Sequence, residues 1–429
     1  MNTVPNPVPV EQLQIGMFIQ LDLGWMDHPF SFSSFKIRNE EQIRTLQSMG
    51  LKTVRWDPAR SEIQPQQALP SDAIAPVPPA APQAAITTTS ATDAQMAAKR
   101  QRMQELSAHR QKIARVEQAF TSAAAVVRNI NRDIYSQPEK TVVVASEMVG
   151  ELVETLLTAP ELAVHVMADK PGSEDVYFHS LNVAVLSMIL ARELHLPADL
   201  VKLLGVGALF HDIGLNEIPS KILLNPGTLT KAEREFRELH CQYGFDIGKK
   251  AGLAPSILHI IYQHHEHFDG SGYPQKLKGE AIDPMARIIA LVNAFDSLCN
   301  PVNIAQAMTP HEALSLMFSK HRTYFDPRAL QTFIRFMGVY PPGTIVALSN
   351  DAIGLVINVN PSRPLRPSII VYDAGIPKQE AIILDLGDEP DINITRAIRP
   401  AQLPPAIYEY LSPRRRVSYF FDPGNAPQT

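Results

Sequence analysis

Histidine and aspartate side chains in the central region constrain the fold more than any other feature of this chain. Between residues 141 and 340, apolar residues recur at three- and four-residue spacing, which predicts helices divided by prolines and glycines. The polar positions lie in separate predicted helices or helix ends, 24 to 32 residues apart, and are His179, His211-Asp212, His240, His264-His265 and Asp296. One helix cannot bring such positions together, but the facing helices of a bundle can. The sequence therefore predicts a helical bundle.

These residue types indicate a site for metal ions. Neutral imidazoles and carboxylates bind first-row divalent metals, whereas a structural zinc site would call for paired cysteines, which this region lacks. An aspartate directly after a histidine can bridge two metals with its two oxygens. Two cations held about 3.5 to 4 Å apart can clamp a phosphate and activate a water for in-line displacement. The pattern therefore favours metal-dependent hydrolysis of a phosphate ester.

Isolated histidines carry a weaker signal. His165, His195, His259 and His311 are interpreted as hydrogen-bonded structural residues. His211 differs, because it closes the apolar run 203–210 and is followed directly by a carboxylate. Burying both groups costs free energy unless they have partners, and a metal ion is a natural partner.

A second motif begins at the histidine pair and runs through residues 264–274, His-His-Glu-His-Phe-Asp-Gly-Ser-Gly-Tyr-Pro. Two glycines and a proline predict a tight loop with accessible backbone amides. Alone, Gly-Tyr-Pro indicates only a turn. Beside the histidine pair and the upstream His-Asp pair, it becomes a specific signature.

Together these motifs resemble the HD-GYP phosphodiesterases, metal-dependent hydrolases of the bacterial second messenger cyclic di-GMP within the HD superfamily. The match covers about residues 174–335. It rests on His179-Ser180-Leu181-Asn182-Val183, His211-Asp212-Ile213-Gly214, Ile218-Pro219, Asn225-Pro226-Gly227, His240, His264-His265-Glu266, Asp269-Gly270-Ser271-Gly272-Tyr273-Pro274, and Arg287 with Asp296. The N-terminal segment, with Leu13, Gly16-Met17, Trp25 and His28-Pro29-Phe30, resembles a domain of unknown function often found ahead of this catalytic domain.

The resemblance implies a mainly α fold with an HD-type bundle that opens cyclic di-GMP to linear pGpG, and onward to GMP. It implies metal ligation by His179, His211, Asp212, His240, His264, His265 and Asp296. Asp212 would bridge two divalent ions, iron or manganese foremost, with nickel, cobalt or zinc as alternatives. Asp175, four residues before His179, is a candidate ligand of a third ion or a solvated carboxylate at a helix start. Asp269 and a metal-bound water are the candidate proton donors to the leaving 3′ oxygen.

The loop of Gly270, Gly272, Tyr273 and Pro274 is expected to shape the substrate pocket or to contact a partner. By the resemblance, that partner is a diguanylate cyclase domain.

Two positions depart from the family pattern. Leu215 stands where the family usually has a lysine after His-Asp-Ile-Gly, and residues 300–303, Asn-Pro-Val-Asn, replace a basic cluster. Each charge-assisted phosphate contact is worth about 1.5 to 3 kcal/mol, so substrate binding is expected to be weaker. Lys221, Arg287, Lys276 and Lys278 are candidates to compensate. The rival hypotheses are a different cyclic dinucleotide or phosphomonoester as substrate, and a metal-containing scaffold that binds cyclic di-GMP with weak turnover.

Changes in composition divide the chain. Prolines and alanines crowd residues 65–82, which is typical of a stiff solvated linker. Beyond residue 340, short β-rich runs separated by turn residues predict a small barrel or sheet. The expected parts are a small α/β module at 1–62, a linker at 63–95, an amphipathic helix at 96–140, the catalytic domain at 141–340, a β-rich domain at 341–415 and a tail at 416–429.

The helix after the linker carries a heptad stripe. Leu106, Ile113, Phe120, Val127 and Ile134 recur every seven residues. The 103–134 helix is therefore expected either to pair two copies of the chain or to dock on the next domain.

Composition excludes several classes. With 45% hydrophobic and 19% charged residues, the chain is a globular protein rather than a disordered or collagen-like one. A net charge of -5 offers no basic surface for nucleic acid or an anionic membrane. Two cysteines, no secretory leader and no apolar stretch of about 20 residues make the cytoplasm the expected location.

Overall fold

The computed structural model describes most of the chain. The described residues are 6–23, 28, 30, 33–63, 118–158, 164–166, 175–225, 227–303, 306–359, 363–378, 381–411 and 419–421, with isolated positions between 104 and 115. Beyond its first residue, the predicted linker at 63–95 lies outside them, as does Trp25.

The N-terminal module is a four-stranded antiparallel sheet with one helix. Strands β1 (Asn6–Pro9), β2 (Phe18–Gln20), β3 (Ser34–Lys36) and β4 (Thr53–Asp57) lie in the order β1-β4-β2-β3. Helix α1 (Glu40–Ser48) begins at Asn39, whose side chain accepts from the backbone N–H of Gln42. Alternate residues Val54 and Trp56 of β4 are buried in the core of this module, as the period of a half-buried strand requires.

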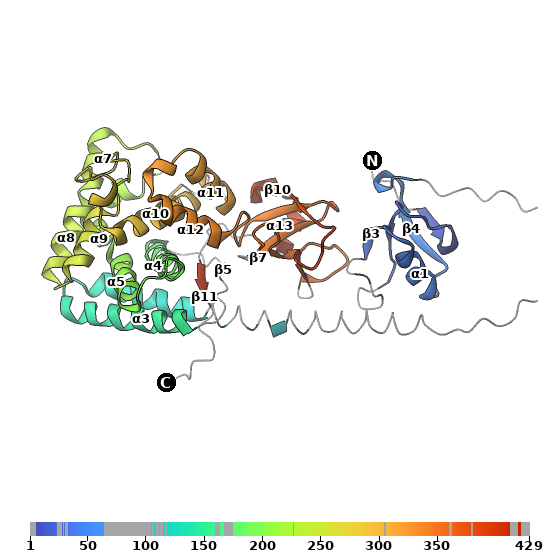
Figure 1. Ribbon diagram of the computed structural model, residues 1–429, viewed down its shortest axis with the longest axis horizontal. Helices are drawn as coiled ribbons and strands as arrows, with labels where there is room; N and C mark the ends of the chain where they lie inside the picture. Colours follow the sequence, from blue (N-terminus) through green and yellow to red (C-terminus); the bar gives the residue numbers. More distant parts are fainter. Residues whose placement is uncertain are drawn as a thin grey trace, which may run out of the picture. The chain divides into compact units, whose positions relative to one another are not determined.

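The central region is helical, as predicted (Figure 1). Its helices are α3 (Pro138–Thr158), α4 (Asp175–Glu193), α5 (Ala198–Phe210), α6 (Ser220–Leu223), α7 (Lys231–Glu238), α8 (His240–Lys250), α9 (Pro255–Gln263), α10 (Pro284–Cys299), α11 (Pro310–Ser319) and α12 (Pro327–Met337), with 3-10 turns η4 (Ile213–Glu217), η5 (Gly279–Ala281) and η7 (Arg322–Tyr324). Helix α5 packs against α3, α4 and α9, and α10 packs against α4, α9, α11 and α12. Seven consecutive residues of α5, 204–210, are buried, so α5 is the central helix of the bundle.

Local signals fix where these helices begin. Helices α7 and α11 start with capping boxes, Thr230 with Glu233 and Thr309 with Glu312. Helix α10 starts with an Asp283 cap followed by proline. These caps satisfy backbone N–H groups that have no partner inside a helix.

The heptad stripe packs within its own chain over the part that the structure describes. Residues 118–133 are helical, and Phe120, Val127 and Ile130 are buried in the same core as α4 and α5. Docking on the catalytic domain therefore accounts for this part of the stripe, and pairing between copies stays a prediction for the residues before 118.

The C-terminal β-rich region forms the expected sheet. Strands β6 (Ile345–Leu348), β7 (Ile353–Asn358), β8 (Ser368–Val371), β9 (Ile382–Asp385) and β10 (Ile394–Ile398) lie in the order β10-β6-β7-β8-β9, and η9 (Pro400–Gln402) and α13 (Pro405–Leu411) follow. The mainly α fold with a small sheet in each terminal region is thus confirmed. A two-stranded ribbon of β5 (Val164–Val166) and β11 (Tyr419–Phe421) was not predicted, because three residues are too short to show a period.

Among the described helices, none combines the length and hydrophobicity needed to cross a bilayer.

Candidate metal centre

Helix ends bring the predicted ligands together. His211 caps the C-terminal end of α5 and is followed by Asp212, while His264 caps the C-terminal end of α9 and is followed by His265. His240 is the first residue of α8, and His179 lies within α4. Because α5 packs on both α4 and α9, and α8 packs on α9, these side chains meet beside the central helix.

The carboxylate of Asp212 lies at the middle of the cluster. Its Oδ2 is 3.4 Å from Nε2 of His211 and 3.7 Å from Nε2 of His179. Its Oδ1 is 3.3 Å from Nε2 of His240 and 3.4 Å from Nε2 of His264. Two ligand groups therefore share Asp212: a first group of His179, His211 and Asp212, and a second group of Asp212, His240, His264 and His265.

Backbone carbonyls orient three of the imidazoles in the same way. Nδ1 of His211 donates to the carbonyl of Ala208, and Nδ1 of His264 donates to that of Ile261. Both carbonyls lie in the last turns of α5 and α9, where a carbonyl group accepts no hydrogen bond from within its own helix. Nδ1 of His240 likewise donates to the carbonyl of Arg237, at 2.7 Å. With a proton on Nδ1, each ring directs its Nε2 towards Asp212, which is the orientation that a metal-binding histidine needs.

The buried atoms around Asp212 fit divalent cations. Nε2 of His211 and Oδ1 of Asp212 are buried and lack a hydrogen-bond partner. Nε2 of His240 and Nε2 of His264 lie only 3.3 Å apart. Lone pairs of nitrogen and carboxylate oxygen repel one another unless positive charge lies between them. A nitrogen and oxygen donor set of this kind suits first-row divalent ions.

The pKa shifts show the same demand for positive charge. Burial raises the pKa of Asp212, but contacts with His211, His240 and His264 outweigh it and hold that pKa well below its usual value. Burial lowers the pKa of His240, yet its contacts with Asp212 and Cys241 raise it to about 10. Burial lowers the pKa of His264 to about 4 and that of His265 well below its ordinary value. Without metal, His240 is therefore the one imidazole of the second group that is positively charged near neutral pH.

Asp296 lies beside the first group rather than in it. Its Oδ2 accepts from Nδ1 of His179 at 2.6 Å. Its Oδ1 accepts from the side-chain amides of Asn182 and Asn300, both at 2.9 Å. Direct metal ligation by Asp296 stays a prediction, and the contact seen here is one that orients the ring of His179. Contributions from Asn182 and Asn300 were not predicted. The spacing could have indicated them, because Asn182 lies three residues after His179 and Asn300 lies four residues after Asp296, in each case one helical turn away.

The Gly-Tyr-Pro loop packs back onto the histidine pair. The ring of Tyr273 stacks on His265, with centroids 4.6 Å apart, and its backbone N–H donates to the carbonyl of His265. A Cβ at Gly272 would collide with the backbone of His265 and His267, so only glycine allows this approach. The buried carboxylate of Glu266 accepts from the backbone N–H groups of Gln275 and Leu277. The loop therefore holds the ring of His265 in place.

A glycine also brings the two groups close together. A Cβ at Gly214, two residues after Asp212, would collide with the backbone of His240 and Gly244. The turn η4 thus lies directly on the first turn of α8.

Of the remaining predicted residues, those with described side chains belong to neither ligand group. Oδ1 of Asp269 accepts from the N–H of Ser271, and its Oδ2 accepts from the hydroxyl of Thr323. Arg287 donates to Oδ2 of Asp326 at 2.8 Å and to the carbonyl of Ile282, so it ties α10 to the start of α12. Lys221 is exposed on α6, and Pro274 is exposed on the loop. Asp175 is the first residue of α4, and its side chain lies outside the described residues.

Comparisons with known protein families agree with this geometry. Residues 161–329 match the HD domain, residues 7–145 match a domain of unknown function termed DUF3391, and residues 345–405 match a KOW domain associated with the HD domain. The chain therefore contains an HD domain preceded by an N-terminal DUF3391 domain, as the sequence motifs predicted.

Three relatives sharpen the comparison. The cyclic di-GMP phosphodiesterase PA4108 of Pseudomonas aeruginosa is 29% identical over 393 residues, covering 89% of this chain and 88% of its own. The cyclic di-GMP phosphodiesterase response regulator RpfG of Xanthomonas campestris is 34% identical over 149 residues, covering 34% and 39%. The 3'3'-cGAMP-specific phosphodiesterase 3 of Vibrio cholerae is 33% identical over 164 residues, covering 38% and 35%. The last two alignments thus span little more than a third of either chain.

Proposed function

We propose that this protein is a metal-dependent phosphodiesterase that hydrolyses cyclic di-GMP to linear pGpG, and onward to GMP. The observation that carries the proposal is the position of Asp212, whose two oxygens each face a separate set of imidazoles. The likeness to PA4108 over most of both chains supports the substrate class.

The metal ligands of the proposal are the two groups described above. When bound, two divalent ions supply Lewis-acid charge to the phosphate and lower the pKa of water to the neutral range. Asp212 would fix the position of one ion relative to the other, because its carboxylate belongs to both ligand groups. Asp296 holds the ring of His179, and the Tyr273 ring holds that of His265.

Asp269 is better suited to shaping the loop than to donating a proton. Burial raises its pKa, but hydrogen bonds from Ser271 and Thr323 outweigh this and lower the pKa below the ordinary value. Asp269 is therefore ionised at neutral pH and can only accept. The proton for the leaving 3′ oxygen must come from another source.

The basic groups that face the substrate phosphates are fewer than in the family pattern. Leu215 replaces a lysine in η4, and Asn300 in the altered 300–303 segment uses its amide to hold Asp296. Arg287 is committed to Asp326. Lys221, on the short helix that follows η4, is exposed, as are Lys276 and Lys278, so all three stay candidates for a phosphate contact.

The finer points of the proposal concern ions, partners and location. A centre of nitrogen and oxygen donors favours iron or manganese, and a third ion requires Asp175 as its ligand. The exposed loop residues Ser271 and Pro274 offer a surface for a diguanylate cyclase domain. The two described cysteines are unpaired, which agrees with the reducing cytoplasm.

Turnover of a panel of cyclic dinucleotides by protein loaded with ferrous or manganous ion tests the function. We expect cyclic di-GMP to be hydrolysed to pGpG, and hydrolysis to stop when a chelator removes the ions. Binding of cyclic di-GMP without any product would contradict the proposal and indicate a scaffold.

A second candidate substrate is a mixed cyclic dinucleotide. The observation that favours it is Leu215, since an apolar side chain at this point of η4 changes the surface that follows Asp212. The relative from Vibrio cholerae bears the name of a 3'3'-cGAMP-specific enzyme. Faster turnover of 3'3'-cGAMP than of cyclic di-GMP in the same panel would establish it.

A further inference from the structure

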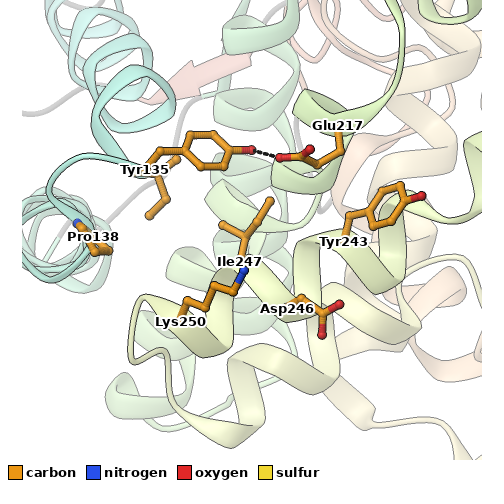
Figure 2. Close-up of a pocket in the computed structure, with 8 residues that line it drawn as sticks. Tyr135, Pro138, Glu217, Tyr243, Asp246, Ile247 and Lys250 are labelled. Atoms are coloured by element: carbon orange, nitrogen blue, oxygen red, sulfur yellow. Dashed lines mark hydrogen bonds between the residues drawn. The ribbon is translucent and has the colours of Figure 1, made fainter.

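A cavity of about 320 Å³ lies where the incoming helix of residues 118–133 meets the helical domain. Three parts of the chain form its wall (Figure 2): residues 134–138, Glu217 at the end of η4, and one face of α8. No member of the two ligand groups lines it, so it is separate from the metal centre.

The lining combines flat apolar surface with charge. On α8, the lining residues recur at i, i+3, i+4 and i+7 and therefore share one helix face; they are Tyr243, Asp246, Ile247 and Lys250. Across the cavity, the hydroxyl of Tyr135 donates to Oε1 of Glu217 at 2.8 Å (Figure 2). Ile134 and Pro138 complete the apolar part.

This lining selects a flat ring that carries N–H donors. Ionised carboxylates only accept hydrogen bonds, so a ligand of Glu217 or Asp246 must donate. Guanine presents two adjacent N–H donors on one edge, which match the two oxygens of one carboxylate. In the protein, Oε1 of Glu217 also accepts from Tyr135 and Oδ1 of Asp246 also accepts from Nε2 of Gln242, and a carboxylate oxygen can accept a second hydrogen bond. Adenine presents a donor beside an acceptor and does not match. The ring of Tyr135, which points across the pocket towards Glu217 (Figure 2), favours a planar base, and Lys250 offers a charge for a phosphate.

The volume limits the size of the ligand. Pockets for small molecules measure about 300 to 1,000 Å³, and this cavity lies at the lower end of that range. It therefore suits one base with its sugar and phosphate, and not the two bases of a cyclic dinucleotide.

We propose that this cavity binds a guanine mononucleotide and thereby reports the end product to the metal centre. The identity of the end product rests on the function proposed above, whereas the choice of guanine rests on the lining. Glu217 ends the turn that begins directly after Asp212, and that turn lies on the first turn of α8, which carries His240. A nucleotide held between Glu217 and α8 therefore contacts the turn that follows Asp212 and the helix that carries His240, and bound GMP slows turnover.

Isothermal titration of GMP into the full chain, with metal removed by chelator, tests this site apart from the metal centre. We expect one GMP per chain, and AMP at least tenfold weaker. Glu217→Gln, which keeps the acceptor for Tyr135, and Asp246→Asn should each weaken GMP binding at least tenfold. Glu235→Gln, an exposed carboxylate on α7, is the matched control and should bind GMP as the unaltered protein does.

Three results would overturn the inference: no GMP binding to metal-free protein, equal affinity for AMP and GMP, or unchanged binding by both lining variants. Turnover of cyclic di-GMP, measured on separate metal-loaded samples, keeps the two proposals distinct. GMP binding without such turnover would refute the proposed function and leave the cavity assigned, whereas turnover without GMP binding would refute the cavity alone.

Discussion

The two ligand groups on either side of Asp212 are held by different means. In the first group, polar side chains position His179: Asp296 holds its ring, and Asn182 with Asn300 holds Asp296. The other imidazole of that group, His211, is held by the carbonyl of Ala208. In the second group, backbone and ring contacts do it: the carbonyls of Arg237 and Ile261 hold His240 and His264, and Tyr273 stacks on His265.

This difference indicates which substitutions should disturb each ligand group. A chain of side chains can be cut at any one of its members, whereas a helix carbonyl cannot be removed by substitution. The first group should therefore respond to changes in polar residues, and the second to changes that move the backbone of the Gly-Tyr-Pro loop. Asp212 belongs to both groups and should be the one position at which both sides fail together.

Replacement of the shared carboxylate, Asp212→Ala, should have the largest effect. It removes a ligand from both sides, so we expect loss of both ions and a fall in turnover of more than about 100-fold, beyond the usual effect of an outer contact. Elemental analysis of the purified variant measures this. Asp199→Ala, at an exposed position in the first turn of α5, is the matched control. Full metal content in Asp212→Ala would refute the bridging role.

Gly272→Ala should act on the second group alone. A Cβ there collides with the backbone of His265 and His267, so the loop must shift and the ring of His265 moves with it. We expect the metal content to fall from two ions towards one. Gly279→Ala is the control, because a Cβ there meets nothing within 4 Å and only the positive φ opposes it, at about 1 kcal/mol. Two ions in Gly272→Ala would argue against a positioning role for the loop.

Loss of the amides that hold Asp296 should act on the first group alone. In the double variant Asn182→Ala with Asn300→Ala, Oδ1 of Asp296 loses both of its donors. Removal of such outer contacts lowers metal affinity by about 10- to 100-fold. Competition with a chelator should show one weakened ion and one unchanged ion. Equal weakening of both would mean that the two groups are not held separately.

Truncation of the stacked ring should give the smallest effect. Tyr273→Ala removes the ring from His265, while Tyr273→Phe keeps it, and a ring pair is worth about 0.5 to 1.5 kcal/mol. We expect the affinity of the second ion to fall a few-fold in the alanine variant and to stay unchanged in the phenylalanine variant. An equal loss in both would assign the contribution to the hydroxyl instead of the ring.

The sequence predicted the parts whose chemistry is rare and missed those whose chemistry is common. His211-Asp212 after a buried apolar run is unusual enough to mark a site, because burying both groups costs free energy. The strands from Thr344 onward were predicted because turn residues bound each one. Asn182 and Asn300 look like any polar residue on a helix. Asn300 reaches Asp296 from one turn further along the same helix, whereas only the packing of α4 on α10 brings Asn182 to Asp296. The contact of Arg287 with Asp326, 39 positions further along the chain, likewise comes from packing and was not predicted, and substrate binding by Arg287 stays a prediction.

Anomalous diffraction from crystals of the full chain grown with manganese tests the central claim most directly. The account predicts two anomalous peaks about 3.5 to 4 Å apart, one beside each oxygen of Asp212, with His179 and His211 around the first and His240, His264 and His265 around the second. A single peak, or two peaks that do not share Asp212, would contradict it.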